Sequence, residues 1–141
     1  MPEAPQPILP ATVDAPWRPA AVIRHETAGG AHFDLLLARR APTGPDDRAC
    51  ATWRAAHDPA AMAVGAETPV EPIDDHRAHY LRLAAAAELP GGRGRVHPVA
   101  RGEWRPGADG AVEVRWEGAG AARYRLDPAG TPAAMLRRIA R

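Results

Sequence analysis

Apolar and polar residues alternate over short stretches along most of the chain that follows residue 20. A period of two residues is typical of β-strands that bury one face. In one such stretch Phe33, Leu35 and Leu37 fall on one face, whereas His32 and Asp34 fall on the other. The stretches that predict strands are residues 21–24, 31–38, 50–55, 95–99, 112–116 and 123–126.

The segments between these stretches predict loops and short helices. Residues 58–75 are rich in alanine, glycine and proline, which predicts a loop with one helical turn. Residues 77–83 are ambiguous, and the alanine run at 84–87 could extend them as a helix. Thr131 is a favourable N-cap and is followed by proline at the first helical position, which predicts a short helix from Ala133 to Ala140.

Many short strands and one terminal helix predict a mainly β fold, a small closed β-barrel-like domain with a short C-terminal helix. Trp53, Trp104 and Trp116 are expected in its core or at its rim. Six of the first 20 residues are prolines, which disfavour helix and central strand because proline lacks a backbone N–H. We therefore expect a proline-rich arm over residues 1–19 and a single domain over residues 20–141.

The composition excludes several classes of protein. The formal net charge is +1, so the chain has no overall basic field that would by itself indicate nucleic-acid binding. All 18 basic residues are arginine, which GC-rich coding explains, although arginine also suits bidentate phosphate contacts. The single Cys50 excludes an intrachain disulfide framework and a cysteine-rich zinc site. No apolar run approaches the roughly 20 residues of a membrane span and no secretory signal is evident, so we expect a cytoplasmic protein without membrane contact.

Three side chains that could bind a metal, His25, His32 and Asp34, lie within ten residues of a chain that has six histidines. His32 and Asp34 share a strand face, and the turn at Gly29 and Gly30 could bring His25 back beside them. Two imidazoles and one carboxylate can hold a divalent ion with open positions, where a water or a phosphoryl oxygen is activated. The alternative is surface or hydrogen-bonded residues without a ligand, and the pattern alone makes the two hypotheses about equal.

A second polar cluster spans residues 74–80. His76 could act there as a general acid or phosphate ligand, with Tyr80 as a hydroxyl donor one helical turn later; the alternative is a solvated charged turn. Arg93 and Arg95, beside a glycine-rich turn, could follow a phosphate backbone, or they could be ordinary exposed residues. The turn itself is too short and misplaced for a dinucleotide or P-loop fingerprint.

Taken in order, these landmarks resemble a known family. They are Arg24-His25-Glu26, His32-Phe33-Asp34, Thr52-Trp53, Asp74-Asp75-His76 with Tyr80, Gly94-Arg95-Val96 and Arg101-Gly102-Glu103-Trp104. The ordered set extends from about residue 21 to about residue 126. It resembles the 3′-phosphoesterase domain of bacterial DNA ligase D, and more closely the small stand-alone relatives of that domain.

The resemblance implies a compact β-barrel-like hydrolase that heals DNA 3′ ends. Such domains remove a 3′-terminal ribonucleoside and then the 3′-phosphate, with manganese as the preferred metal, before ligation in non-homologous end joining. By position, His25, His32 and Asp34 match the metal ligands, His76 the phosphate-contacting histidine and Tyr80 the active-site tyrosine. The expected partners are DNA 3′ ends or a primer–template, with an end-joining ligase or polymerase. Mn²⁺ is the expected metal, although the ligand types also suit Zn²⁺ or Fe²⁺.

Several positions depart from the family pattern. Leu36 stands where an arginine should hold the phosphate, and His57 stands where a lysine is expected. Thr68 and Ile23 replace an arginine and a glutamine, and the segment between the two metal histidines is one residue longer than usual. Losing an arginine–phosphate contact costs several kcal/mol of transition-state stabilisation, on the order of 10²-fold in rate.

Two hypotheses follow from this pattern of retained and missing residues. In the first, the chain is a metal-dependent phosphoesterase in which His57, Arg77 or Arg93 replaces the missing phosphate contact, and Arg95 also contacts nucleic acid. In the second, it is a catalytically impaired, metal-containing module that binds DNA ends or a repair protein. The first predicts that His76 and an arginine converge on one open cleft beside the metal ligands; the second predicts an occluded cleft.

Overall fold

The computed structural model describes residues 15–128 and 134–140, which form nine strands and four short 3₁₀ helices. The strands are β1 (Arg18–Thr27), β2 (Gly30–Ala38), β3 (Cys50–Ala55), β4 (Glu67–His76), β5 (Ala87–Glu88), β6 (Arg95–Pro106), β7 (Val112–Trp116), β8 (Gly120–Pro128) and β9 (Ala134–Ile139). The 3₁₀ helices are η1 (Pro59–Ala61), η2 (Ala78–Arg82), η3 (Pro90–Gly92) and η4 (Ala108–Gly110). β1 thus begins inside the expected arm, of which residues 1–14 lie outside the described part of the chain.

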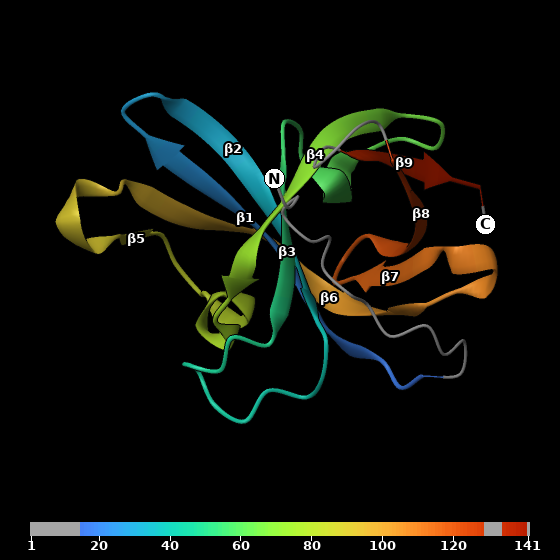
Figure 1. The fold of residues 1–141 in the computed structure, drawn as a ribbon, viewed down its shortest axis with the longest axis horizontal. Helices are drawn as coiled ribbons and strands as arrows, with labels where there is room; N and C mark the ends of the chain where they lie inside the picture. Colours follow the sequence, from blue (N-terminus) through green and yellow to red (C-terminus); the bar gives the residue numbers. More distant parts are fainter. Residues whose placement is uncertain (1–14, 129–133, 141) are drawn as a thin grey trace, which may run out of the picture.

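The strands form one antiparallel sheet that closes on itself. Its order is β1-β2-β3-β4-β9-β8-β7-β6-β5, and β6 also pairs with β1 and so closes a ring, with β5 added beside β6. Figure 1 shows the β1–β2 hairpin and the β5–β6 segment extending on one side, with β7, β8 and β9 on the other. The closed sheet confirms the predicted mainly β, barrel-like fold class.

Large aromatic side chains fill the inside of the ring. Trp53, Trp104 and Tyr124 are each 1% exposed, and Trp116 is 4% exposed. Trp104 Nε1 donates to a backbone carbonyl at 2.8 Å, and Trp116 Nε1 donates to the Tyr124 hydroxyl at 2.9 Å. The Tyr124 hydroxyl in turn donates to the carbonyl of Pro59 at 2.8 Å. The prediction of tryptophans in the core is therefore confirmed.

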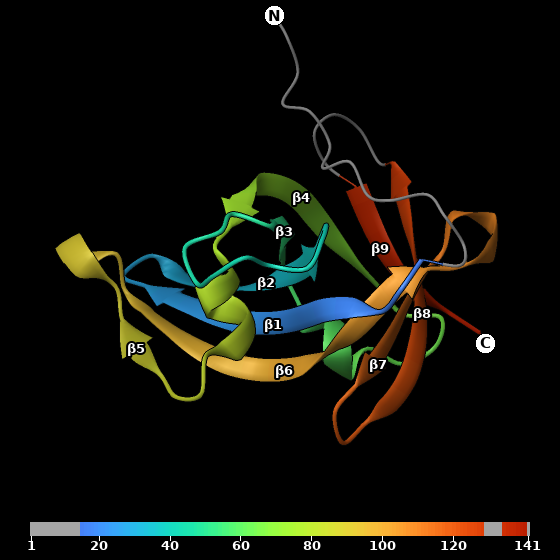
Figure 2. The same ribbon diagram turned by 90° about the horizontal axis from the view of Figure 1, so that it is seen from below.

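A second, smaller apolar cluster lies on the outer face of β1, β2 and β3. Ile23 of β1 and Leu36 of β2 pack there with Leu81 of η2. Figure 2 shows the yellow-green coil of η2 lying across β1 on this side of the sheet. Since side chains two residues apart share a face, the same outer face carries His25 and Asp34 beyond the apolar cluster.

The C-terminal segment is a strand, so the prediction of a helix over residues 133–140 was wrong. β9 pairs with β8 on one side and with β4 on the other, and its buried residues, Ala134 and Leu136, alternate with less buried ones. Without β9, both neighbours would have an unpaired edge. Backbone hydrogen bonding that closes the ring outweighs the helix propensity of the segment. The predicted N-cap at Thr131 lies outside the described residues.

Residues 58–75 are only partly the predicted loop. The expected helical turn is present as η1, whose first turn is capped by Asp58 Oδ1 accepting from Ala60 N at 2.9 Å. From Glu67 onward, however, the chain forms β4 despite two prolines. Thr68 and Val70 point inward from alternate positions of β4 and are 0% and 3% exposed. The burial of these side chains stabilises a strand although proline disfavours one.

The ambiguous segment 77–83 contains the 3₁₀ helix η2, which ends at Arg82. The alanine run does not extend it, because the chain turns toward β5, which pairs with the beginning of β6. Among the described residues, no helix is long and apolar enough to cross a membrane.

Candidate functional site

The β1–β2 hairpin brings the three predicted metal ligands together. His25 and His32 are direct cross-strand partners, and their ring centroids lie 4.9 Å apart. Asp34 follows His32 by two residues and lies on the same face. One ligand atom from each residue lies within 4.8 Å of the other two. These three residues, the metal group, could therefore hold a metal ion. The turn that includes Gly30 brings His25 beside the other two, as the sequence predicted.

His76 reaches the metal group from a distant part of the sequence. It ends β4, where it pairs with Cys50 of β3. Its Nε2 lies 3.6 Å from Asp34 Oδ2, while His32 Nε2 lies 3.3 Å from Asp34 Oδ1. The Asp34 carboxylate, 2% exposed, therefore lies between two imidazoles.

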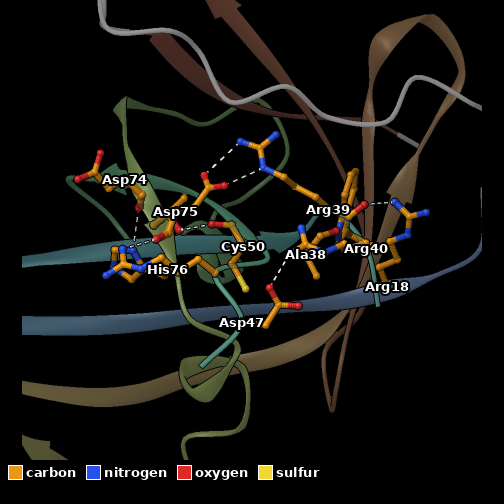
Figure 3. A network of polar contacts seen from close by, with 12 residues as sticks. Arg18, Ala38, Arg39, Arg40, Asp47, Cys50, Asp74, Asp75 and His76 are labelled. Atoms are coloured by element: carbon orange, nitrogen blue, oxygen red, sulfur yellow. Dashed lines mark hydrogen bonds and ion pairs between the residues drawn. The ribbon is translucent and has the colours of Figure 1, made fainter. Parts of the chain in front are cut away.

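A β-bulge in β4 determines where His76 points. Cys50 of β3 pairs with His76 of β4, and the next pair is Thr52 with Ile73. The step from one pair to the next therefore spans two residues in β3 but three in β4. One extra residue reverses the alternation of faces, so His76 rather than Asp75 faces the metal group. Asp75 instead pairs with Arg39, whose Nε lies 3.0 Å from Asp75 Oδ2 (Figure 3).

Two backbone carbonyls determine which histidine nitrogens carry hydrogen. His25 Nε2 lies 2.7 Å from the carbonyl oxygen of Arg93, and His76 Nδ1 lies 3.0 Å from that of Asp74 (Figure 3). Because a carbonyl only accepts hydrogen bonds, His25 Nε2 and His76 Nδ1 are protonated in the neutral rings. The lone pair of His25 is then on Nδ1, where a metal could bind, and that of His76 is on Nε2, beside Asp34.

His32 Nε2 and Asp34 Oδ1 are buried and lie 3.3 Å apart without hydrogen-bond geometry, so neither atom has a hydrogen-bond partner. Such an unpaired buried atom costs about 1–3 kcal/mol, and a divalent cation would satisfy both atoms at once. Burial lowers the pKa of His32, against the opposing effect of Asp34, and so favours the neutral imidazole that binds metals. Both the donor types and their unsatisfied state fit a divalent cation.

Two members of the metal group, His25 and Asp34, lie in the wall of an open cleft of about 460 Å³. The cleft is lined by side chains that bind metals or phosphates in other proteins, namely His25, Asp34, His76, Tyr80, Arg48, Arg54, Arg77 and Arg93. The carboxylates of Asp74 and Asp75 line the cleft as well, and the four arginines beside a potential cation site can still contact an anionic ligand directly. His76 and the arginines thus converge beside the metal group, as the phosphoesterase hypothesis predicts.

Arg54 was not predicted as a site residue. It is the cross-strand partner of Asp34, so the two side chains share a face of the sheet. Its side chain is 45% exposed, and its Nη1 lies 3.8 Å from Glu71 Oε1, a long ion pair that a ligand could replace. Leu36, at the position of the family's arginine, is fully buried and cannot reach the cleft. The alternation of residues along β3 shows which side chains share a face with Arg54. Only the pairing of β3 with β2 shows that this face is the one that carries Asp34.

Arg77 and Tyr80 form another part of the wall. The Arg77 guanidinium carbon lies 5.6 Å from the centre of the Tyr80 ring, and Arg77 Nη1 lies 3.0 Å from Asp46 Oδ1. The Tyr80 hydroxyl and the Asp46 carboxylate raise the pKa of Arg77. The Tyr80 ring centroid is also 5.7 Å from that of His76, so the second polar cluster does face the metal group.

Three predicted site residues do not line the cleft: His32, which lies beside Asp34, and the exposed His57 and Arg95. His57 is exposed beyond the end of β3, where its backbone N–H donates to Thr68 Oγ1 at 3.2 Å. Arg95 is exposed at the beginning of β6, next to Val96, which lines the cleft. Because neighbouring residues of a strand point to opposite faces, Arg95 projects away from the cleft.

A comparison with models of known protein families finds no match, and a comparison with curated protein sequences finds none either. The geometry of the cleft is therefore the basis for assigning a function.

Proposed function

We propose that this chain is a divalent-metal-dependent phosphoesterase of the ligase D type that removes a 3′-phosphate or a 3′-ribonucleotide from DNA ends. One observation supports the proposal: His25 and Asp34 of the metal group, His76 and four arginines line one open cleft. A purely structural metal needs neither an open cleft nor arginines in its wall. The proposed partners are DNA 3′ ends or a primer–template, with an end-joining ligase or polymerase.

His25, His32 and Asp34 would hold the metal, each through one atom. We propose Mn²⁺ from the resemblance to the ligase D domains, and Zn²⁺ is compatible with the same donors. A divalent ion bound there would neutralise charge on phosphoryl oxygens and lower the pKa of a water. Three protein ligands leave positions open for both.

Arg54 would bind the phosphate in place of the arginine that Leu36 replaces. It lies directly across from Asp34, so a phosphate beside the metal group is within reach of its guanidinium. A hydrogen bond between charged partners contributes about 1.5–3 kcal/mol. Arg48, Arg77 and Arg93 line the same cleft and neutralise the remaining negative charge.

His76 would contact the phosphate through Nε2. Its Nδ1 is hydrogen-bonded to the carbonyl of Asp74, which orients the ring toward Asp34 and the cleft. In the doubly protonated imidazolium, Nε2 carries a second proton besides the one on Nδ1, and that Nε2 proton can pass to the leaving oxygen, a transfer that typically contributes 10²–10⁴-fold in rate. The Tyr80 ring lies beside that of His76, with the two ring centroids 5.7 Å apart.

The test is Mn²⁺-dependent processing of a primer–template that carries a 3′-phosphate or a single 3′-ribonucleotide. The wild type should release phosphate or the ribonucleoside, Asp34→Ala should not, and His76→Gln should do so far more slowly. His57→Gln is the matched control, because it removes an exposed histidine outside the cleft. A wild type that binds Mn²⁺ but leaves both ends unchanged would refute the proposed activity.

The buried Leu36 favours a second candidate, a catalytically impaired module that binds DNA ends or a repair protein. In that case the arginines would bind the phosphate without accelerating its hydrolysis. Fluorescence anisotropy with a labelled 3′-phosphorylated duplex would show metal-dependent binding, while the same preparation would give no product. Both candidates therefore predict metal-dependent binding of the DNA end, and only the phosphoesterase predicts a product.

A further inference from the structure

The glycine-rich turn before β6 contacts the metal group, although its sequence matches no ligand-binding motif. We propose that residues 90–94 form a positioning element that raises metal affinity by orienting His25. The inference rests on the proposed function only in taking His25 as a metal ligand. It assigns the turn a role in metal binding rather than in contact with a nucleotide.

The carbonyl of Arg93 is the group that would act on His25. Its oxygen lies 2.7 Å from His25 Nε2, which leaves the lone pair of the ring on Nδ1. Histidines that bind metals commonly donate their other N–H to a carbonyl or carboxylate, which fixes both tautomer and ring orientation. The backbone of Arg93, rather than its guanidinium, would therefore prepare His25 for the metal.

Gly94 allows the turn to lie against β1. It has φ +97°, and a Cβ placed on it would lie 1.9 Å from the carbonyl oxygen of Glu26, the residue after His25. Only glycine permits both this backbone conformation and this approach. The Gly94 carbonyl also accepts a hydrogen bond from Leu89 N at 2.8 Å, which closes the turn.

Gly92 provides a matched comparison within the same turn. Its φ is +70°, so a side chain there is also strained, but a Cβ would meet nothing within 4 Å. Alanine at position 92 therefore adds strain without pushing the turn away from β1. Alanine at position 94 adds strain and must also move the backbone by about 1 Å to bring the 1.9 Å contact to 3.0 Å. A movement of that size breaks the hydrogen bond to His25.

The experiment measures Mn²⁺ affinity in the full chain without DNA, by electron paramagnetic resonance of the free ion. Gly94→Ala should bind Mn²⁺ about 10- to 100-fold more weakly than the wild type, as expected for loss of a group that orients a metal ligand. Gly92→Ala should bind as the wild type does. Equal affinity of Gly94→Ala and the wild type would overturn the inference.

A measurement on the wild type covers the case in which Gly94→Ala does not fold, which circular dichroism would reveal. Long-range ¹H–¹⁵N NMR of the metal-free protein should show His25 protonated at Nε2 and not at Nδ1. The Nδ1-protonated form would overturn the inference without any substitution. A chain that passes both tests but does not process 3′ ends would refute the proposed activity alone, and a wild type that binds no Mn²⁺ would refute the metal centre and the inference together.

Discussion

The Asp34→Asn variant should be more stable than the wild type without metal and should lose the stabilisation that metal provides. Asp34 is 2% exposed, and its Oδ1 has no hydrogen-bond partner. Asparagine has nearly the same shape without the charge, and its amide can donate to His76 Nε2, which lies 3.6 Å from Asp34 Oδ2. Removing the unsatisfied carboxylate should raise the free energy of unfolding by about 1–2 kcal/mol, since an unpaired buried group costs about 1–3 kcal/mol.

With metal bound, the wild type should be more stable than Asp34→Asn. A ligand at 100 times its Kd stabilises the folded state by about 2.7 kcal/mol. For a domain of this size, 1 kcal/mol shifts Tm by about 4 °C, so saturating Mn²⁺ should raise the wild-type Tm by roughly 10 °C. Asp34→Asn should respond little, because it lacks the carboxylate ligand.

Thermal unfolding followed by circular dichroism, in EDTA and in Mn²⁺, measures both effects. Asp74→Asn is the control, because it removes an exposed carboxylate of the same cleft and should change stability by less than about 0.5 kcal/mol. An equal Mn²⁺ shift in Asp34→Asn and the wild type would show that Asp34 is not a ligand. A variant less stable than the wild type in EDTA would show that the carboxylate is a satisfied structural ion pair.

Three further predictions concern the cleft and the thiol beside it. His76→Gln should lower kcat by about 10²–10⁴-fold in the primer–template assay, whereas His57→Gln should leave it unchanged. Arg54→Gln should lower kcat/KM by roughly 10- to 150-fold, the equivalent of about 1.5–3 kcal/mol, and Arg95→Gln should not. Burial raises the pKa of the Cys50 thiol from 9.0 to about 12, so a thiol reagent at pH 8 should modify the native chain far more slowly than the unfolded chain. Folding favours the neutral thiol, so the stability that this pKa shift contributes is complete below pH 9 and is lost as the pH rises through 12. Measuring the free energy of unfolding across this alkaline range would show the loss.

Local features of the fold could be predicted because each depends on neighbours in sequence. Alternation in residues 31–38 indicated both a strand and the face that carries His32 and Asp34, and β2 (Gly30–Ala38) has that arrangement. The glycines at its start indicated the turn that places His25 opposite His32. The metal group could therefore be predicted, since all three residues belong to one hairpin.

Contacts between distant segments could not be predicted in the same way. His76 faces Asp34 because a bulge adds one residue to β4, and Arg54 faces it because β3 pairs with β2 in one particular register. A shift of one residue in either pairing would turn these side chains to the opposite face. The sequence did not indicate that His57 and Arg95 lie outside the cleft, because sequence position does not show which face of the closed sheet a residue occupies.

By itself, the sequence determined the short strands, the hairpin that carries the metal group and the aromatic core, because a period of two and a glycine turn act within a few residues. Only the tertiary structure decided that residues 134–139 form a strand and that four arginines border one cleft. The physical reason is the same in both cases. Closing a sheet pairs backbone groups of segments far apart in sequence, and this pairing overrides local propensity and sets the register that orients each side chain.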